Sequence, residues 1–118
     1  MITISTLFII FVIFLHIYFL ILEMFLWNKP YGLKTFDHTQ EMADKTKVLA
    51  SNQGLYNGFL AAGLVWGLLA QNGMDIKIFF LSCIVIAGLY GSVTASRKIL
   101  FFQAIPGFLA LLFLFLDL

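Results

Sequence analysis

Four apolar stretches dominate the chain, and short polar segments separate them. A helix that crosses a membrane needs about 20 mostly apolar residues. Stretches close to this length cover residues 7–27, 54–71, 76–95 and 99–116. Backbone groups in hydrocarbon must find hydrogen-bond partners within their own segment, so we expect helices rather than open strands. The pattern predicts an all-α membrane protein, a four-transmembrane-helix antiparallel bundle that forms a single domain over residues 1–118.

Residues 28–51 are the one long polar connection. Pro30 is expected to end the first helix. Asp37 is followed three residues later by Gln40, a spacing that resembles a capping box. Two interpretations of this segment stay open: a short helix that starts at about His38 and runs into the second span, or a solvated connector.

Composition supports a location in the membrane. Hydrophobic residues make up 62% of the chain, charged residues 11%, and the mean hydropathy is +1.01. Soluble domains usually carry about 25% charged residues. The net charge of +1 does not suggest a nucleic-acid partner. The expected partner is the lipid bilayer.

The basic residues are unevenly placed. Of the seven, only Lys77 lies on the side of the termini, at the start of the third span. The other six lie in the first and third connections: Lys29, Lys34, Lys45, Lys47, Arg97 and Lys98. The positive-inside rule places these two connections in the cytoplasm. The protein is therefore expected to be a multi-pass protein of the cell membrane with both termini on the outer side.

With this topology, the hydrogen-bonding side chains of all four spans fall in the cytoplasmic half. We predict that they form a cytoplasm-facing polar pocket. Its candidate ligand-binding residues are His16, Glu23, Asn52, Gln53, Tyr56, Asn57, Tyr90, Thr94 and Gln103. A polar group that faces lipid lacks partners, so Glu23 is expected to face the bundle interior. We expect a side-chain oxygen of Glu23 within about 3.2 Å of Asn52, Gln53 or Tyr56.

Glu23 is the candidate catalytic acid or base. Two other roles stay open for it: its carboxylate extends to the membrane interface, or it holds helices together by hydrogen bonds. His16 is expected to be a hydrogen-bonding core residue. Because no second His or Cys lies at ligand spacing, we expect no metal site and no cofactor. The second span carries two pairs of glycines at a spacing of four, Gly54 with Gly58 and Gly63 with Gly67. They predict close helix contacts and offer a face for homo-oligomers.

Two segments carry a family resemblance: NQGLYNGFLAAGLVWG and AGLYGSVTASRKILFFQAIPG. With the H…LEMFLW segment of the first span, they resemble the small membrane proteins grouped as domain of unknown function family 1304. The match covers nearly the whole chain. It implies a four-helix membrane protein whose activity is unassigned, and it supplies no site.

A weaker resemblance is to the membrane-associated eicosanoid and glutathione metabolism family, which also has four spans and a polar cytoplasmic half. Asn52, Tyr56 and the LVWG run match its second-span pattern, and Tyr90 with the basic residues after it matches the end of its third span. The family's acidic residue in the second span falls at Leu55 here, and the clustered arginines of its fourth span are absent. The resemblance therefore implies a similar fold but not glutathione chemistry, because the glutathione carboxylates need such cations.

The chain also resembles small multidrug exporters in length, number of spans and a glutamate in the first span. Glu23, however, lies near one end of its span, and the charge bias differs from that of dual-topology proteins. Three functions follow as hypotheses: a protein that binds a small amphipathic or lipid-derived ligand, a proton-coupled transporter that uses Glu23, and a non-catalytic structural subunit. Whether the protein is an enzyme stays open.

Overall fold

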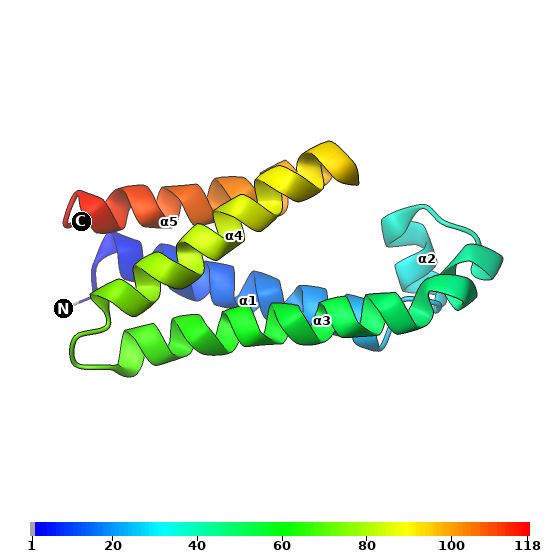
Figure 1. Ribbon diagram of the computed structural model, residues 1–118, viewed down its shortest axis with the longest axis horizontal. Coiled ribbons are helices and arrows are strands. Elements are labelled where there is room, and N and C mark those ends of the chain that lie inside the picture. Colours follow the sequence, from blue (N-terminus) through cyan, green and yellow to red (C-terminus); the bar gives the residue numbers. More distant parts are fainter. Residues whose placement is uncertain (1) are drawn as a thin grey trace. The chain divides into compact units, whose positions relative to one another are not determined.

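The computed structural model describes residues 2–118, and the regular structure within them is helical (Figure 1). In chain order the helices are α1 (Ile4–Met24), α2 (Pro30–Phe36), α3 (Gln40–Leu69), α4 (Met74–Thr94), the π-helix η1 (Leu100–Ala104) and α5 (Ile105–Phe115). Each predicted apolar stretch lies largely within one or two of these helices. The all-α fold is confirmed.

The connection after α1 differs from the prediction. Helix α1 ends at Met24, a few residues before the predicted boundary, and Pro30 begins α2 instead of only ending the first helix. Proline suits the first turn of a helix because its φ is already helical and the missing N–H needs no partner there. Gly32 of α2 is buried, and a methyl group in place of its hydrogen would collide with the Leu26 carbonyl. The turn can therefore close tightly only with glycine at this position.

Helix α3 confirms one of the two interpretations of the polar connection. It begins at Gln40 and continues without a break for 30 residues into the predicted second span. Its first turn is capped by Thr39, whose Oγ1 accepts a hydrogen bond from the Met42 N–H at 3.1 Å. The predicted capping box of Asp37 and Gln40 is wrong, because Asp37 adopts a left-handed conformation (φ 52°) that ends α2.

The chain divides into two compact units, one formed by the residues up to Leu15 with Leu60–Leu118, the other by His16–Phe59. The first unit has an aliphatic core, and Phe8 stacks on Phe113 beside it with ring centroids 5.2 Å apart. The fully or almost fully buried members of this core are Ile9, Val12, Ile13, Ala61, Leu64, Leu81, Ile84, Ala110 and Leu114. They come from α1, α3, α4 and α5, so all four helices contribute to one core.

Helix α4 and the η1–α5 segment lie side by side in this unit (Figure 1). The π-helix precedes Pro106, whose ring would clash with the carbonyl four residues earlier in a regular α-helix. The wider π turn relieves this clash. It also carries Ala104 onto Gly88: a methyl group at Gly88 would lie 2.5 Å from the Ala104 nitrogen. The two backbones are therefore in close contact.

The glycines of α3 also face other helices, as their spacing predicts. In the His16–Phe59 unit, a methyl group at Gly58 would lie 2.7 Å from Leu20 Cδ1. In the other unit, a methyl group at Gly63 would run into the Phe80 ring. Both glycines thus allow a bulky side chain of a neighbouring helix to lie directly on α3.

Two of the described helices are long and apolar enough to cross a membrane, namely α1 and α4. The apolar segment Leu100–Phe115 is shorter, and α3, half of which is polar, is not among the candidates. The predicted four-span topology, the outer position of the termini and the single domain stay predictions.

The Gly88–Ala104 contact yields a test. We expect Gly88→Leu to lower the free energy of unfolding by roughly 1–3 kcal/mol, because the new side chain must push two backbones apart. Thermal unfolding of the purified protein measures the change. The control is Ala87→Leu, one residue earlier on an exposed position, which should leave stability nearly unchanged. Equal unfolding temperatures for both variants would show that α4 and η1 do not pack through Gly88.

Candidate functional site

Glu23 and Asn57 form the polar contact between α1 and α3 within the His16–Phe59 unit. The Asn57 side-chain amide donates a hydrogen bond to Glu23 Oε1 at 2.5 Å. Both side chains are partly buried. A carboxylate in apolar surroundings is costly unless it is hydrogen-bonded, and the amide of Asn57 meets this need.

The position of this contact follows from the small residues of α3. Ala43, Ala50 and Gly54 are buried and recur at spacings of seven and four, so they form one stripe along the helix. Asn57 lies seven residues after Ala50 and therefore on the same stripe. A methyl group at Gly54 would lie 2.6 Å from Met24 Cγ and 3.1 Å from Glu23 Cβ. The glycine thus lets α3 approach α1 closely enough for the Asn57 amide to reach the Glu23 carboxylate.

His16 lies on α1 seven residues before Glu23, hence about 20° from it by the 3.6-residue repeat. Its side chain is completely buried. The imidazole packs edge-to-face against Phe19, with ring centroids 5.2 Å apart and an interplanar angle of 69°. His16 is therefore an interior residue of α1, as predicted.

The three expected partners of Glu23 do not make the predicted hydrogen bond. Asn52, Gln53 and Tyr56 are exposed, and the Tyr56 ring packs at 6.0 Å from Phe59. The predicted partner of Glu23 is therefore wrong: the donor is Asn57, a different polar side chain of the same helix. The buried stripe of alanine and glycine was the sequence signal that could have selected it.

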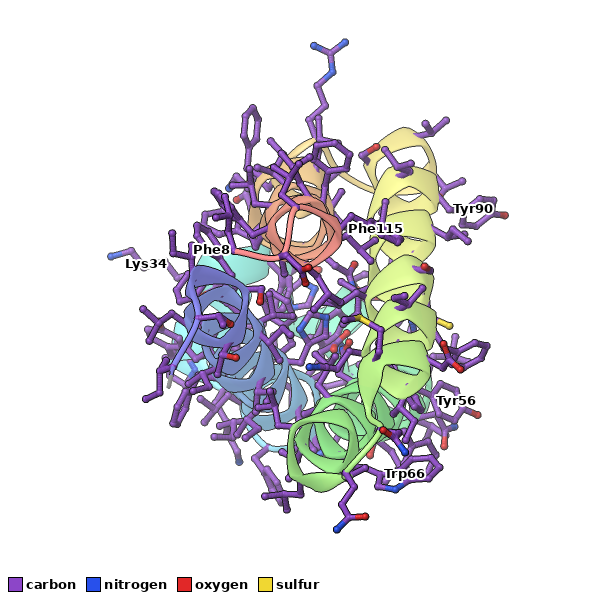
Figure 2. All side chains as sticks on the ribbon, turned by 90° about the vertical axis from the view of Figure 1, so that its left-hand side faces the viewer. Phe8, Lys34, Tyr56, Trp66, Tyr90 and Phe115 are labelled. Carbon is purple, nitrogen blue, oxygen red and sulfur yellow. The ribbon has the colours of Figure 1, made fainter. Side chains whose placement is uncertain are left out.

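The other predicted pocket residues, Tyr90, Thr94 and Gln103, belong to the unit that contains α4 and η1. Tyr90 is 72% exposed and points away from α5 (Figure 2). Thr94 Oγ1 donates to the Tyr90 backbone carbonyl at 2.8 Å, so it completes the last turn of α4. Gln103 is partly buried in η1 and has an interaction within the protein. Their role in ligand binding stays a prediction.

A polar and aromatic cluster at the start of α3 was not predicted. The Trp27 indole lies 4.6 Å from the His38 ring and 4.7 Å from the Phe36 ring, measured between centroids. Its Nε1 donates to Thr46 Oγ1 at 3.1 Å. His38 Nε2 lies 3.2 Å from the Trp27 carbonyl oxygen. Trp27 is thus held by both α2 and α3.

Three polar side chains extend this cluster. Asn28 Nδ2 and Gln40 Nε2 both donate to Asp44 Oδ1, at 3.1 and 3.0 Å. These hydrogen bonds, that from Asn28 first, lower the pKa of the Asp44 carboxyl below its usual value. Gln40 Nε2 also donates to the Asn28 backbone carbonyl at 3.0 Å. The network fixes the turn after α1 to the first turns of α3, and we see in it a structural role.

Among residues 2–118, no group of three or more His, Cys, Asp or Glu side chains is placed to hold a metal ion. The candidate site consists of the Glu23 carboxylate and the Asn57 amide, and the buried His16 imidazole lies about two helical turns away on α1.

The fold and the site define the class of the protein: it is an apolar helical protein in which a carboxylate and an amide from two helices form a hydrogen bond. The chain belongs to the family described as protein of unknown function (DUF1304), whose sequence profile matches residues 10–115. It is 31% identical over 98 residues to the uncharacterized protein YpaA of Lactococcus lactis subsp. lactis (strain IL1403), an alignment that covers 80% of this chain and 82% of YpaA. No solved structure gives a significant match. The predicted family is confirmed, and it brings no assigned function.

The Glu23–Asn57 contact can be tested by substitution. Glu23→Ala leaves the Asn57 amide without its acceptor and should lower the free energy of unfolding by roughly 1–3 kcal/mol. Glu23→Gln keeps the shape and an acceptor oxygen, so its effect should be smaller. The control Gln53→Ala, one turn before Asn57 and exposed, should change little. A Glu23→Ala protein as stable as the control would argue against a contact that matters for folding.

Proposed function

We propose that this is a multi-pass protein of the cell membrane whose four apolar segments cross the bilayer. Two described helices satisfy the length and hydropathy of a span. Large apolar side chains also face outward on both, such as Phe14 of α1, 66% exposed, and Phe79 of α4, 61% exposed. A protein surrounded by water rarely exposes so many large apolar side chains. Lipid chains would cover these residues at no cost.

We further propose that the polar connections at 28–51 and 96–98 lie in the cytoplasm and both termini outside. Six of the seven basic residues lie in these two connections. The cytoplasmic excess of Lys and Arg is the general rule for short loops of membrane proteins.

Cysteine accessibility tests this orientation. In a Cys83→Ser background, Thr35→Cys should react with a membrane-impermeant maleimide only from the cytoplasmic side. Leu118→Cys should react only from outside. The opposite pattern would reverse the topology, and labelling of both positions from one side would contradict an odd number of spans between them.

Within the membrane, we propose that the protein binds a small amphipathic or lipid-derived ligand at Glu23 and Asn57. The observation that carries the proposal is the Glu23–Asn57 hydrogen bond on the small-residue stripe of α3. An ionisable group within a membrane segment is rare and usually functional. The carboxylate accepts hydrogen bonds or pairs with a cation, and the apolar side chains of Leu20 and Met24 pack on the same stretch of α3. The fitting ligand therefore has a polar or cationic head and an apolar body.

The weaker resemblance to the eicosanoid and glutathione metabolism family suggests a lipid-derived ligand in particular. It does not extend to glutathione, because Leu55 replaces the family's acidic residue and Arg97 is the one arginine in the chain. Catalysis is not part of the proposal.

The test is mass spectrometry of small molecules retained by the purified protein. Wild type should carry an amphipathic compound at defined stoichiometry. Glu23→Gln should lose it while its thermal unfolding stays close to wild type, because the substitution removes the charge and keeps the shape. The control is Glu41→Gln, which removes an exposed carboxylate that pairs with Lys45 on α3 and should retain the compound. Equal retention by Glu23→Gln and wild type would contradict a ligand at this carboxylate.

Proton-coupled transport by Glu23 is the second candidate function. It is favoured because the side chain that donates a hydrogen bond to Glu23 is the neutral amide of Asn57 and not a cation. Proton uptake into proteoliposomes that depends on an added amphipathic cation, and that Glu23→Gln abolishes, would support transport over simple binding. If Glu23→Gln retains every function of wild type in cells and only Glu23→Ala is defective, the contact is a structural one.

A further inference from the structure

The end of α4 and the beginning of η1 enclose a recess that the Glu23 site does not use. Its volume is about 600 Å³, and it is lined by Ser92, Val93, Arg97, Leu100 and Phe101. All five residues belong to the same compact unit. The volume lies within the range of about 300–1,000 Å³ typical of small-molecule sites.

The residues that line the recess include one cation, Arg97, and three apolar side chains, those of Val93, Leu100 and Phe101. Arg97 supplies a guanidinium, whose planar array of donors suits a phosphate oxygen pair. In the described part of the chain the ion pair present is that of Lys45 with Glu41, so no protein carboxylate neutralises Arg97. A positive group without a protein counter-ion, beside an apolar wall, is complementary to an anion that carries a hydrocarbon body.

Ser92 restricts the ligand further. Its hydroxyl donates to the Leu89 carbonyl at 2.7 Å, so its oxygen remains an acceptor. Arg97 is therefore the donor to the anion, whereas Ser92 can accept a hydrogen bond from a hydroxyl on the ligand. Val93, Leu100 and Phe101 offer no polar side-chain atoms and suit acyl chains.

In the proposed topology, the recess also lies at the depth of the lipid headgroups. Helix α4 ends at Thr94, and Arg97 follows three residues later. In the proposed topology this connection is cytoplasmic, where the inner leaflet carries anionic headgroups that attract Lys and Arg. The apolar wall on α4 and η1 would then face the acyl region, and the guanidinium the phosphate.

We propose that this recess, which we call the Arg97 recess, binds one anionic phospholipid. The lipid phosphate pairs with the Arg97 guanidinium, and an acyl chain lies along Val93, Leu100 and Phe101. The inference rests on the proposed membrane location and is independent of the ligand at Glu23.

Native mass spectrometry with added lipid tests the proposal. Phosphatidylglycerol should bind wild type at one molecule per chain, and phosphatidylcholine should bind markedly less. Arg97→Gln should weaken phosphatidylglycerol binding about tenfold or more, as expected for a lost charge-assisted hydrogen bond. The matched control is Lys77→Gln, which removes a cation near the other end of α4 and should leave binding unchanged.

Val93→Trp gives a second, charge-neutral test. Val93 is exposed, so the larger side chain should not disturb folding, but it would fill the recess and weaken phosphatidylglycerol binding. Equal losses in Arg97→Gln and Lys77→Gln, equal binding of both lipids, or displacement of the lipid by inorganic phosphate would each overturn the proposal.

The two proposals fail separately. Glu23→Gln should leave phosphatidylglycerol binding intact, since Glu23 does not line the Arg97 recess. Extraction of the protein from cell membranes by alkaline carbonate would contradict the membrane location itself. Retention in the membrane together with lipid binding that does not depend on Arg97 would contradict the Arg97 recess alone.

Discussion

The close approach of helix backbones through glycine and alanine is the constraint on which both units depend. In the proposed membrane location there is no hydrophobic drive to bring apolar helices together, so association would rely on close packing and internal hydrogen bonds. Gly54 and Gly58 allow α1 side chains to lie on α3, and Gly88 allows η1 to lie on α4. The Glu23–Asn57 hydrogen bond depends on the same closeness, because a bulky residue at Gly54 would hold the two side chains apart.

The helices were the predictable part of the fold. Their apolar stretches are long, and the backbone of such a stretch has few alternatives to a helix. The direction in which a single side chain points was harder to predict, because the position of a residue along a helix axis does not determine which side of the helix it lies on. Tyr90 and Thr94 share the predicted depth with Glu23, but Tyr90 projects outward and Thr94 bonds to its own helix. Asn57 could have been selected from its place on the stripe of small residues, whereas the sequence alone offers no such guide for Gln103.

The turn after α1 was missed for a different reason. Its order comes from contacts between residues ten or more positions apart, such as Trp27 with Thr46 and Asn28 with Asp44. Local signals there were ambiguous: proline can follow the end of one helix or begin the next, and Asp37 resembled an N-cap but ends α2. A polar segment between apolar helices can therefore hold as much specific structure as the helices, although its composition suggests a solvated connector.

The π-helix has a consequence for how the chain can vary in length. One residue adds about 100° of rotation around a helix axis. The extra residue within η1 therefore sets which side of α5 carries Gly107, Ala110 and Leu114, the residues that are buried in this unit. Deleting one residue from Leu100–Ala104 would restore regular α-helical winding, yet it would turn that buried side away from α4. The C-terminal helix should accordingly accept many single substitutions on its exposed side and tolerate a change of length within η1 poorly.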